Sequence, residues 1–148
     1  MAVDITDSTA KDVRVLIYGT KGDEKRFLLV QRAEGGYSLP GGYKNTDDAD
    51  LRIVATRALK DALGLDEFSY TLKDTELAGE DTEIYTDPVS GIRKDISVHL
   101  FVARYNGEQE IKPSADIQRA LWFKESSAQT LFAQEHMERL FMHGAGYC

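Results

Sequence analysis

The chain has little cysteine, little proline and no long apolar run, and these scarcities exclude several classes of protein. Cys148 is the only cysteine among 148 residues, which excludes an internal disulfide and a cysteine-rich metal site. No apolar stretch is long enough to cross a bilayer, and residues 1–12 carry acids in place of the apolar core of a secretory signal. We therefore expect a cytoplasmic protein with no membrane partner.

Basic residues are also in the minority. The chain has 18 Lys and Arg against 25 Asp and Glu, a net charge of −7. A general nucleic-acid binder needs a basic face that displaces counterions from phosphates, so no nucleic-acid partner is expected. A small anionic ligand held by a local group of cations stays compatible with this charge.

What remains is the composition of an ordinary globular protein. Hydrophobic residues make up 42% of the chain and charged residues 29%, which is enough apolar surface for a core. A chain of this length buries roughly two-thirds of its unfolded surface as one domain. We expect a single domain over residues 1–148.

Periodicity predicts the order of strands and helices. Residues 13–18 and 27–32 are short β-branched and aromatic runs around a Gly-rich turn, which indicates a hairpin. Apolar residues recur at spacings of three and four over residues 51–62, which indicates an amphipathic helix. Residues 83–86 and 96–102 flank a Pro-x-x-Gly turn at 87–91, as antiparallel strands do. Ser126 to Gln129 resembles a capping box that opens a C-terminal helix ending near Gly144. The expected fold class is α/β: a central mixed sheet with a helix on each side.

One segment, residues 39–65, carries a recognisable pattern: LPGGYKNTDDADLRIVATRALKDALGL. It resembles the signature of the Nudix hydrolases, G-x5-E-x7-R-E-U-x-E-E-x-G-U, in which U is apolar. Aligned from its C-terminal end, Arg57 takes the place of the box arginine and Gly64 that of the last glycine. The strand at 27–32, the approach at 36–40, the long strand at 94–105 and the Leu-Trp-Phe of 121–123 follow in the family's order. The resemblance implies a Nudix-like α/β/α sandwich.

In that alignment, the helix glutamates of the family are mostly replaced. Ala58 stands in the first position, Asp61 in the second and Ala62 in the third. In the family these glutamates converge on one helix face and hold magnesium or manganese, which prefer oxygen ligands. The resemblance therefore implies a degenerate box in which Asp61 alone offers a carboxylate, with weak Mg or Mn binding at most.

The loop half of the box is out of register. From Gly42 to Gly64 is 22 positions (64 − 42), one more than the family spacing. The loop acid is Asp48 when counted from the glycine, and Ala49 when counted from the arginine. Asp48 and Asp50 have an ordinary alternative as caps of the helix N-terminus. Arg57 either steadies a catalytic acid, as in the family, or pairs with Asp61 across one turn.

Acids outside the box offer a second way to complete a metal site. One candidate is Glu80, within the acidic group Glu76, Glu80, Asp81 and Glu83, and the other is Asp116. The resemblance allows both, because many Nudix enzymes take a base or a metal ligand from outside the box. The ordinary alternative is that both groups are solvated loop charges.

Binding of an anionic ligand has better candidates. Gly41 and Gly42 offer backbone amides to a phosphate, and Arg32 and Lys44 are placed to meet an anion if the Nudix register holds. Each cation is equally an ordinary surface residue. His99, in the middle of an apolar strand, is expected to be packed and hydrogen-bonded instead of catalytic.

Three hypotheses stay open. The first is a Nudix-fold protein with a degraded metal site that binds a nucleotide-like or diphosphate ligand, or a protein partner, with weak or no pyrophosphohydrolase activity. The second is an active Mg- or Mn-dependent hydrolase of nucleoside diphosphate derivatives that uses Asp61, Asp48 and an acid outside the box, with Arg57 in support. The third is a different chemistry on this fold, such as isomerisation. The sequence decides neither the ligand nor the oligomeric state.

Overall fold

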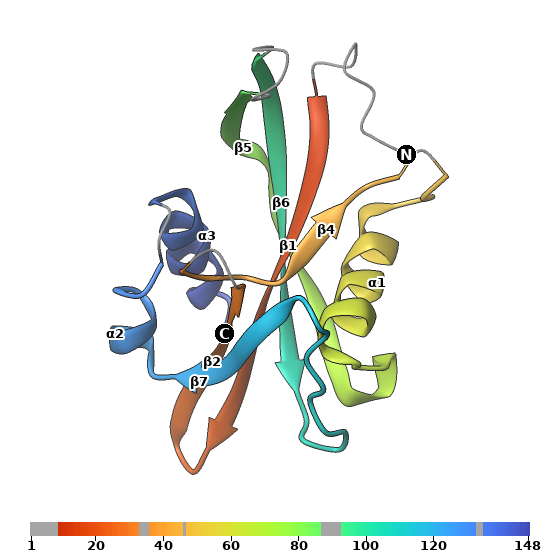
Figure 1. Ribbon diagram of the computed structural model, residues 1–148. Helices are drawn as coiled ribbons and strands as arrows, with labels where there is room; N and C mark the ends of the chain where they lie inside the picture. Colours follow the sequence, from red (N-terminus) through yellow and green to blue (C-terminus); the bar gives the residue numbers. More distant parts are fainter. Residues whose placement is uncertain (1–8, 33–35, 46, 87–92, 133–134) are drawn as a thin grey trace.

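A mixed β-sheet forms the centre of the protein, with helices on both of its faces (Figure 1). The computed structural model describes residues 9–32, 36–45, 47–86, 93–132 and 135–148. The strands of these residues are β1 Thr9–Lys21, β2 Glu24–Arg32, β3 Tyr37–Ser38, β4 Gly41–Tyr43, β5 Tyr70–Thr86, β6 Arg93–Tyr105 and β7 Ile117–Phe123. The helices are α1 Leu51–Leu63, the 3-10 turn η1 Glu67–Ser69, α2 Glu125–Ala128 and α3 Glu135–Ala145.

The sheet is mixed because one pair of its long strands is parallel. Its main path runs β3-β2-β1-β6-β5, with β4 added beside β1 and β7 beside β2. β1 and β6 pair in parallel, and the chain between them includes α1 and β5; the other described pairs are antiparallel. This confirms the expected α/β class with a central mixed sheet.

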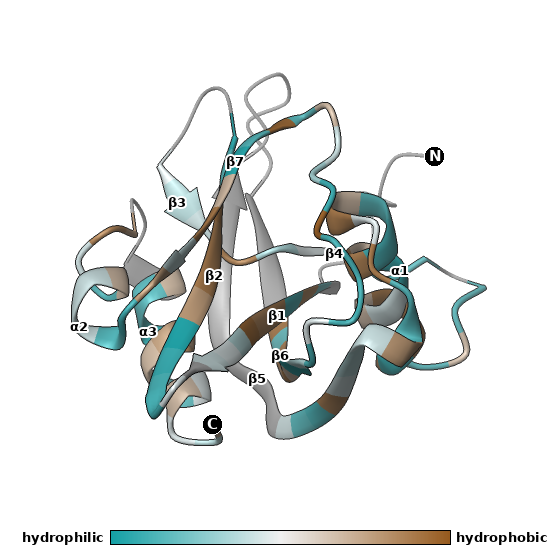
Figure 2. Ribbon diagram, turned by 90° about the horizontal axis from the view of Figure 1, so that it is seen from below, coloured by the Kyte–Doolittle hydropathy of each residue, from teal (hydrophilic) through white to brown (hydrophobic). Residues whose placement is uncertain are grey.

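Alternating side chains divide the core into two halves, as expected when successive residues of a strand point to opposite faces. Val13, Val15 and Ile17 of β1 pack with α1 on one face. Leu16 of β1 packs with Leu140 and Phe141 of α3 on the other. Figure 2 shows this apolar character along the strands and on the inner sides of the helices. The expected placement of the box helix and a C-terminal helix on opposite sides is confirmed.

Both ends of α1 are set by the residues that the sequence analysis singled out. The carboxylate of Asp50 accepts the backbone N–H of Ile53 at 3.0 Å, which makes Asp50 the N-cap. Gly64 ends the helix in the left-handed conformation, φ 69°, and its N–H donates to the carbonyl of Lys60. These local signals therefore fix the helix that carries the box.

The C-terminal prediction needs a correction. The sequence predicted one helix opened by a capping box at Ser126, whereas the structure has two helices, α2 and α3, and α2 begins at Glu125 without a side-chain cap bond. Between them Phe132 forms a bridge with Tyr37 of β3 and packs against the ring of Phe141, 5.4 Å between centroids. This tertiary contact competes with continuation of the helix. The predicted turn at 87–91 lies outside the described residues.

None of the described helices combines the length and the apolar character that a membrane span requires.

Candidate functional site

A cleft of about 340 Å³ lies between α1, β4, the end of β2 and the segment before β7. We call it the box cleft. It gathers most of the residues that the sequence pattern singled out; its lining is Arg32, Gly41, Gly42, Tyr43, Asn45, Val54, Arg57, Ala58, Asp61, Ala62, Ser114 and Asp116. Of the predicted site residues, Lys44 and Asp48 do not line it, and the side chain of Glu80 lies outside the described part of the structure.

The face of α1 toward the box cleft carries two methyl groups and one carboxylate. Ala58 and Ala62 retain 7% and 8% exposure, and both border the cleft. Asp61 is exposed. A Cβ built on Gly42 would lie 3.9 Å from the Cβ of Ala58, in ordinary contact. Ala58 therefore packs α1 against β4, and both alanines form part of the cleft wall.

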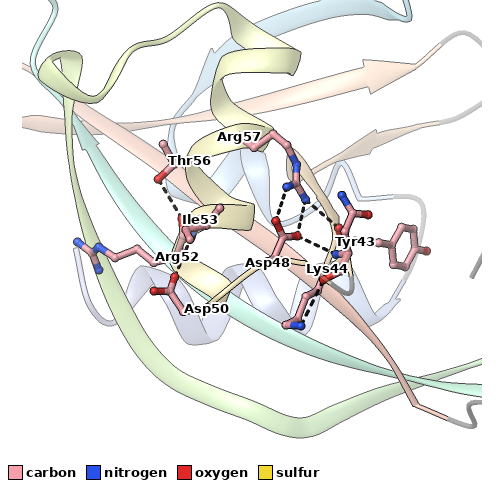
Figure 3. Close-up of polar contacts among 9 residues, drawn as sticks. Tyr43, Lys44, Asp48, Asp50, Arg52, Ile53, Thr56 and Arg57 are labelled. Carbon is pink, nitrogen blue, oxygen red and sulfur yellow. Dashed lines mark hydrogen bonds and ion pairs between the residues drawn. The ribbon is translucent and has the colours of Figure 1, made fainter. Parts of the chain in front are cut away.

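Arg57 pairs with Asp48 of the loop and, among the described ion pairs, not with Asp61. Of the two alternatives from the sequence, the pairing with Asp61 is therefore wrong, and the role beside a catalytic acid stays a prediction. The guanidinium of Arg57 donates to both carboxylate oxygens of Asp48, at 2.7 and 3.0 Å, and to the carbonyl of Tyr43 at 3.1 Å. Asp48 also accepts the backbone N–H of Asn45 at 2.7 Å. Figure 3 shows the two bonds from Arg57 to the Asp48 carboxylate and the third from Arg57 to Tyr43. Bidentate pairing of this kind fixes geometry as well as charge, so Arg57 and Asp48 hold the loop on α1.

The pairing with Arg57 sets both the ionisation and the hydrogen bonds of the Asp48 carboxylate. The hydrogen bonds from Arg57 and Asn45 lower the pKa of Asp48 to about 2, and its side chain keeps only 7% exposure. The carboxylate is ionised and already occupied by three donors. Asp50 is the helix cap, and Asp48 stabilises the loop before it.

The second ion pair of the box cleft joins Arg32 and Asp116. The two side chains are 2.5 Å apart, and the hydroxyl of Ser114 donates to the other Asp116 oxygen at 2.5 Å. The Ser114 hydrogen bond is the main cause that lowers the pKa of Asp116, with Arg32 adding to it. Both charged side chains remain open to solvent, 37% and 67% exposed. The pair is therefore accessible from the solvent.

Lys44 is not among the residues that line the box cleft. Its ammonium group donates to the carbonyl of Asn45 at 3.3 Å and the residue is exposed outside the cleft. Gly41 has a packing reason for being glycine, since a Cβ there would lie 2.2 Å from the carbonyl oxygen of Val13. Both Gly41 and Gly42 pair with β1, so the sheet ladder shares the backbone groups that the sequence analysis assigned to a phosphate.

The carboxylates of the box cleft do not fit a divalent metal held by the protein alone. Asp61 and Asp116 both line the cleft, but Asp116 is engaged by Arg32 and Ser114. Among the described residues no three His, Cys, Asp or Glu side chains gather as a ligand set. Magnesium is often bound through one or two carboxylates and substrate phosphates; here, two cations, Arg32 and Arg57, share the same wall.

His99 is packed, as expected. It is buried, its Nε2 lies 2.8 Å from a carboxylate oxygen of Asp74, and its ring contacts that of Phe101 at 4.9 Å between centroids. Sequence reasoning missed Ser114, which orients Asp116 and lines the cleft. Its position two residues before Asp116, in a segment without strong periodicity, was the one available signal.

Comparison with known proteins gives the family and supports the fold. A family model described as NUDIX domain matches residues 9–143. An Ap4A hydrolase of C. elegans, solved as a binary complex, has a similar structure, with a TM-score of 0.75, 20% identity, and 93% of this chain and 96% of that one covered. The E. coli dihydroneopterin triphosphate pyrophosphohydrolase gives a TM-score of 0.72 at 15% identity, with 93% and 96% covered. The NUDIX domain of Shewanella oneidensis NrtR, complexed with ADP ribose, gives 0.71 at 15% identity, with 95% and 89% covered. No curated protein matches the sequence.

Proposed function

Because the chain belongs to the NUDIX domain family, we propose that it binds a nucleotide-like ligand with a diphosphate group in the box cleft and has weak or no pyrophosphohydrolase activity. The observation that carries the proposal is the face of α1. Ala58 and Ala62 flank Asp61 there and border the cleft with methyl groups. A single exposed carboxylate remains at the point where three acids one helical turn apart would converge on a cation.

The remaining charges of the box cleft favour an anion. Arg32 lies at the end of β2 and reaches the cleft with a partly exposed guanidinium. Arg57 adds a second guanidinium, held in place by Asp48 and 35% exposed. Arginine presents paired N–H groups that match phosphate oxygens. Among the similar solved structures, one is complexed with ADP ribose and another is described as an Ap4A hydrolase. This supports a nucleotide as the class of ligand.

A second candidate function rests on Asp116. The carboxylates of Asp116 and Asp61 both line the box cleft. Magnesium bound to a diphosphate needs only one or two carboxylates from the protein. An active Mg- or Mn-dependent hydrolase would then need the Arg32–Asp116 pair to open, with Arg32 passing to the substrate phosphate. The donor set stays sparse in this arrangement, because Asp48 remains paired with Arg57.

The test is a binding panel measured by calorimetry: sugar nucleotides, dinucleoside polyphosphates and oxidised nucleoside triphosphates, each with EDTA and with Mg²⁺. We expect at least one to bind in EDTA, and Arg32→Gln to weaken it by about tenfold, the loss of a charged hydrogen bond. Arg104→Gln is the matched control, an arginine on β6 outside the box cleft. No binding across the panel, or binding that needs Mg²⁺ and ends in rapid hydrolysis, would reject the proposal.

A further inference from the structure

Strand β7 is an edge of the sheet. Among the strands that the structure describes it pairs only with β2, and Figure 1 shows it beside that strand. The one irregularity of this ladder lies at its start, between Gln31 and Arg32, so the rest of the edge is regular. Proteins commonly protect such an edge with lysine, proline or several charges. Ile117–Phe123 has neither lysine nor proline and a single charge, Arg119, so its outer N–H and C=O groups suit a further strand.

Two side chains on one face of β7 are turned to solvent. Leu121 is 42% exposed. Arg119 is exposed and makes no hydrogen bond or ion pair with any residue that the structure describes. Both share a face with Phe123, which packs in the α3 half of the core, because side chains alternate along a strand. A large apolar residue in the middle of an exposed edge is typical of a strand that pairs with another chain.

A second copy of β7 fits this edge when the two strands run antiparallel with Leu121 on the two-fold axis. In this register Leu121 faces its own copy, Arg119 faces Phe123 of the second copy, and Ala120 faces Trp122 of the second copy. A small residue thus faces a large one, and an arginine lies over an aromatic ring. Because a two-fold interface is self-complementary, each of these pairs occurs twice. Centring on Ala120 would instead place Arg119 against Leu121.

The charges of this register also complement each other. Diagonal neighbours across an antiparallel pair lie about 7–8 Å apart, within reach of long side chains, and Arg119 is diagonal to Glu125 of the second copy. Glu125 follows Lys124, which is in extended backbone. The Glu125 side chain is exposed and forms no ion pair with any residue that the structure describes. Lys124 faces the uncharged Gln118, so no like charges stand opposite each other.

We propose that β7 is a dimerisation edge, at which a second copy of this chain pairs antiparallel about Leu121 and the two sheets become one. The interface is a short pair of strands, at the small end of specific interfaces, so its dissociation constant should be about micromolar. No residue of β7 lines the box cleft, and the dimer is therefore independent of the proposed ligand.

The test is sedimentation velocity of the full chain over about a hundredfold range of concentration around that value. We expect a reversible shift from monomer to dimer. Leu121→Lys brings two like charges together at the axis and should abolish the dimer. This variant should fold, because Leu121 is exposed, and thermal melts check that it does. Arg104→Glu is the control, since Arg104 is also exposed but lies on β6, and it should dimerise as the parent does.

A charge exchange tests the register itself. Arg119→Glu and Glu125→Arg, made singly, should each weaken the dimer by about tenfold, because like charges then meet twice across the axis. The two changes together should restore the affinity to within about threefold of the parent, since each pair of opposite charges is re-formed. A chain that stays monomeric throughout, a dimer that Leu121→Lys leaves unchanged, or a double variant as weak as the single ones would each overturn the proposal. The calorimetric test of the box cleft is unaffected by any of these results.

Discussion

Replacing Ala58 and Ala62 together with glutamate should create a magnesium site. Both positions border the box cleft on the side of Asp61, and α1 is fixed at both ends by Asp50 and Gly64. Residues 58, 61 and 62 are spaced by three and four, so their carboxylates converge over one turn. Three converging carboxylates suit a hard cation, and we expect the double variant to bind Mg²⁺ at least tenfold more tightly than the parent.

The magnitude of the stability change follows from burial. Ala58 and Ala62 are 7% and 8% exposed, so each new carboxylate leaves part of its hydration and should cost about 1–3 kcal/mol without a partner. Mg²⁺ at a concentration of about a hundred times its dissociation constant stabilises the folded variant by about 2.7 kcal/mol. Each kcal/mol shifts the melting temperature by about 2–4 °C in a chain of this size. The variant should therefore melt lower in EDTA and recover much of the loss in Mg²⁺.

The control for this experiment is Ala58→Gln with Ala62→Gln, which keeps the size and removes the charge. Thermal melts in EDTA and in Mg²⁺ report stability, and calorimetry reports affinity. The glutamine variant should show no magnesium-dependent recovery. A folded glutamate variant that binds Mg²⁺ no better than the glutamine variant would refute the placement of these residues on one metal-facing surface.

Three further predictions test single carboxylates in the box cleft and in the loop beside it. Asp61→Asn should keep ligand affinity and stability within about 1 kcal/mol, as expected for an exposed charge; loss of a measured hydrolase activity in a folded variant would instead favour the second candidate function. The pKa of Asp48 is lowered to about 2, against 3.8 for the free carboxyl. The ionised Asp48 therefore contributes stability that is present above about pH 4 and is lost as the pH falls toward about 2. In thermal melts across this window, Asp48→Asn should lose less stability than the parent, and equal losses of stability would contradict the pairing with Arg57. Asp116→Asn should free Arg32 and raise affinity for a diphosphate ligand several-fold by calorimetry, whereas unchanged affinity would place the ligand elsewhere.

The parts of the fold that sequence predicted were those set by local signals. The hairpin of β1 and β2 and the whole of α1 follow from the spacing of apolar residues, the turn residues and the helix caps. Each of these signals lies within a few residues of the element that it determines. Asp50 as N-cap and Gly64 as C-cap are examples. The two-sided core followed from the same alternation.

The pairing of charges could not be predicted in the same way. The extra residue in the loop left two registers for the acid, and the contact of Arg57 with Asp48 is decided by how the loop folds back over α1. Arg32 and Asp116 are 84 positions apart and meet only because β2 pairs with β7. Between α2 and α3, Phe132 contacts Tyr37 of β3, far from it in the sequence. Each of these is a long-range contact that local pattern does not encode.

We propose above that the box cleft binds a diphosphate-containing nucleotide without efficient hydrolysis. The most direct test is turnover of the tightest ligand of the panel, followed by phosphorus NMR with saturating Mg²⁺ or Mn²⁺. We expect saturable binding with a turnover number well below the ordinary enzyme range of about 1–10³ s⁻¹. A turnover number within that range would contradict it and identify the protein as an active hydrolase with a sparse metal site.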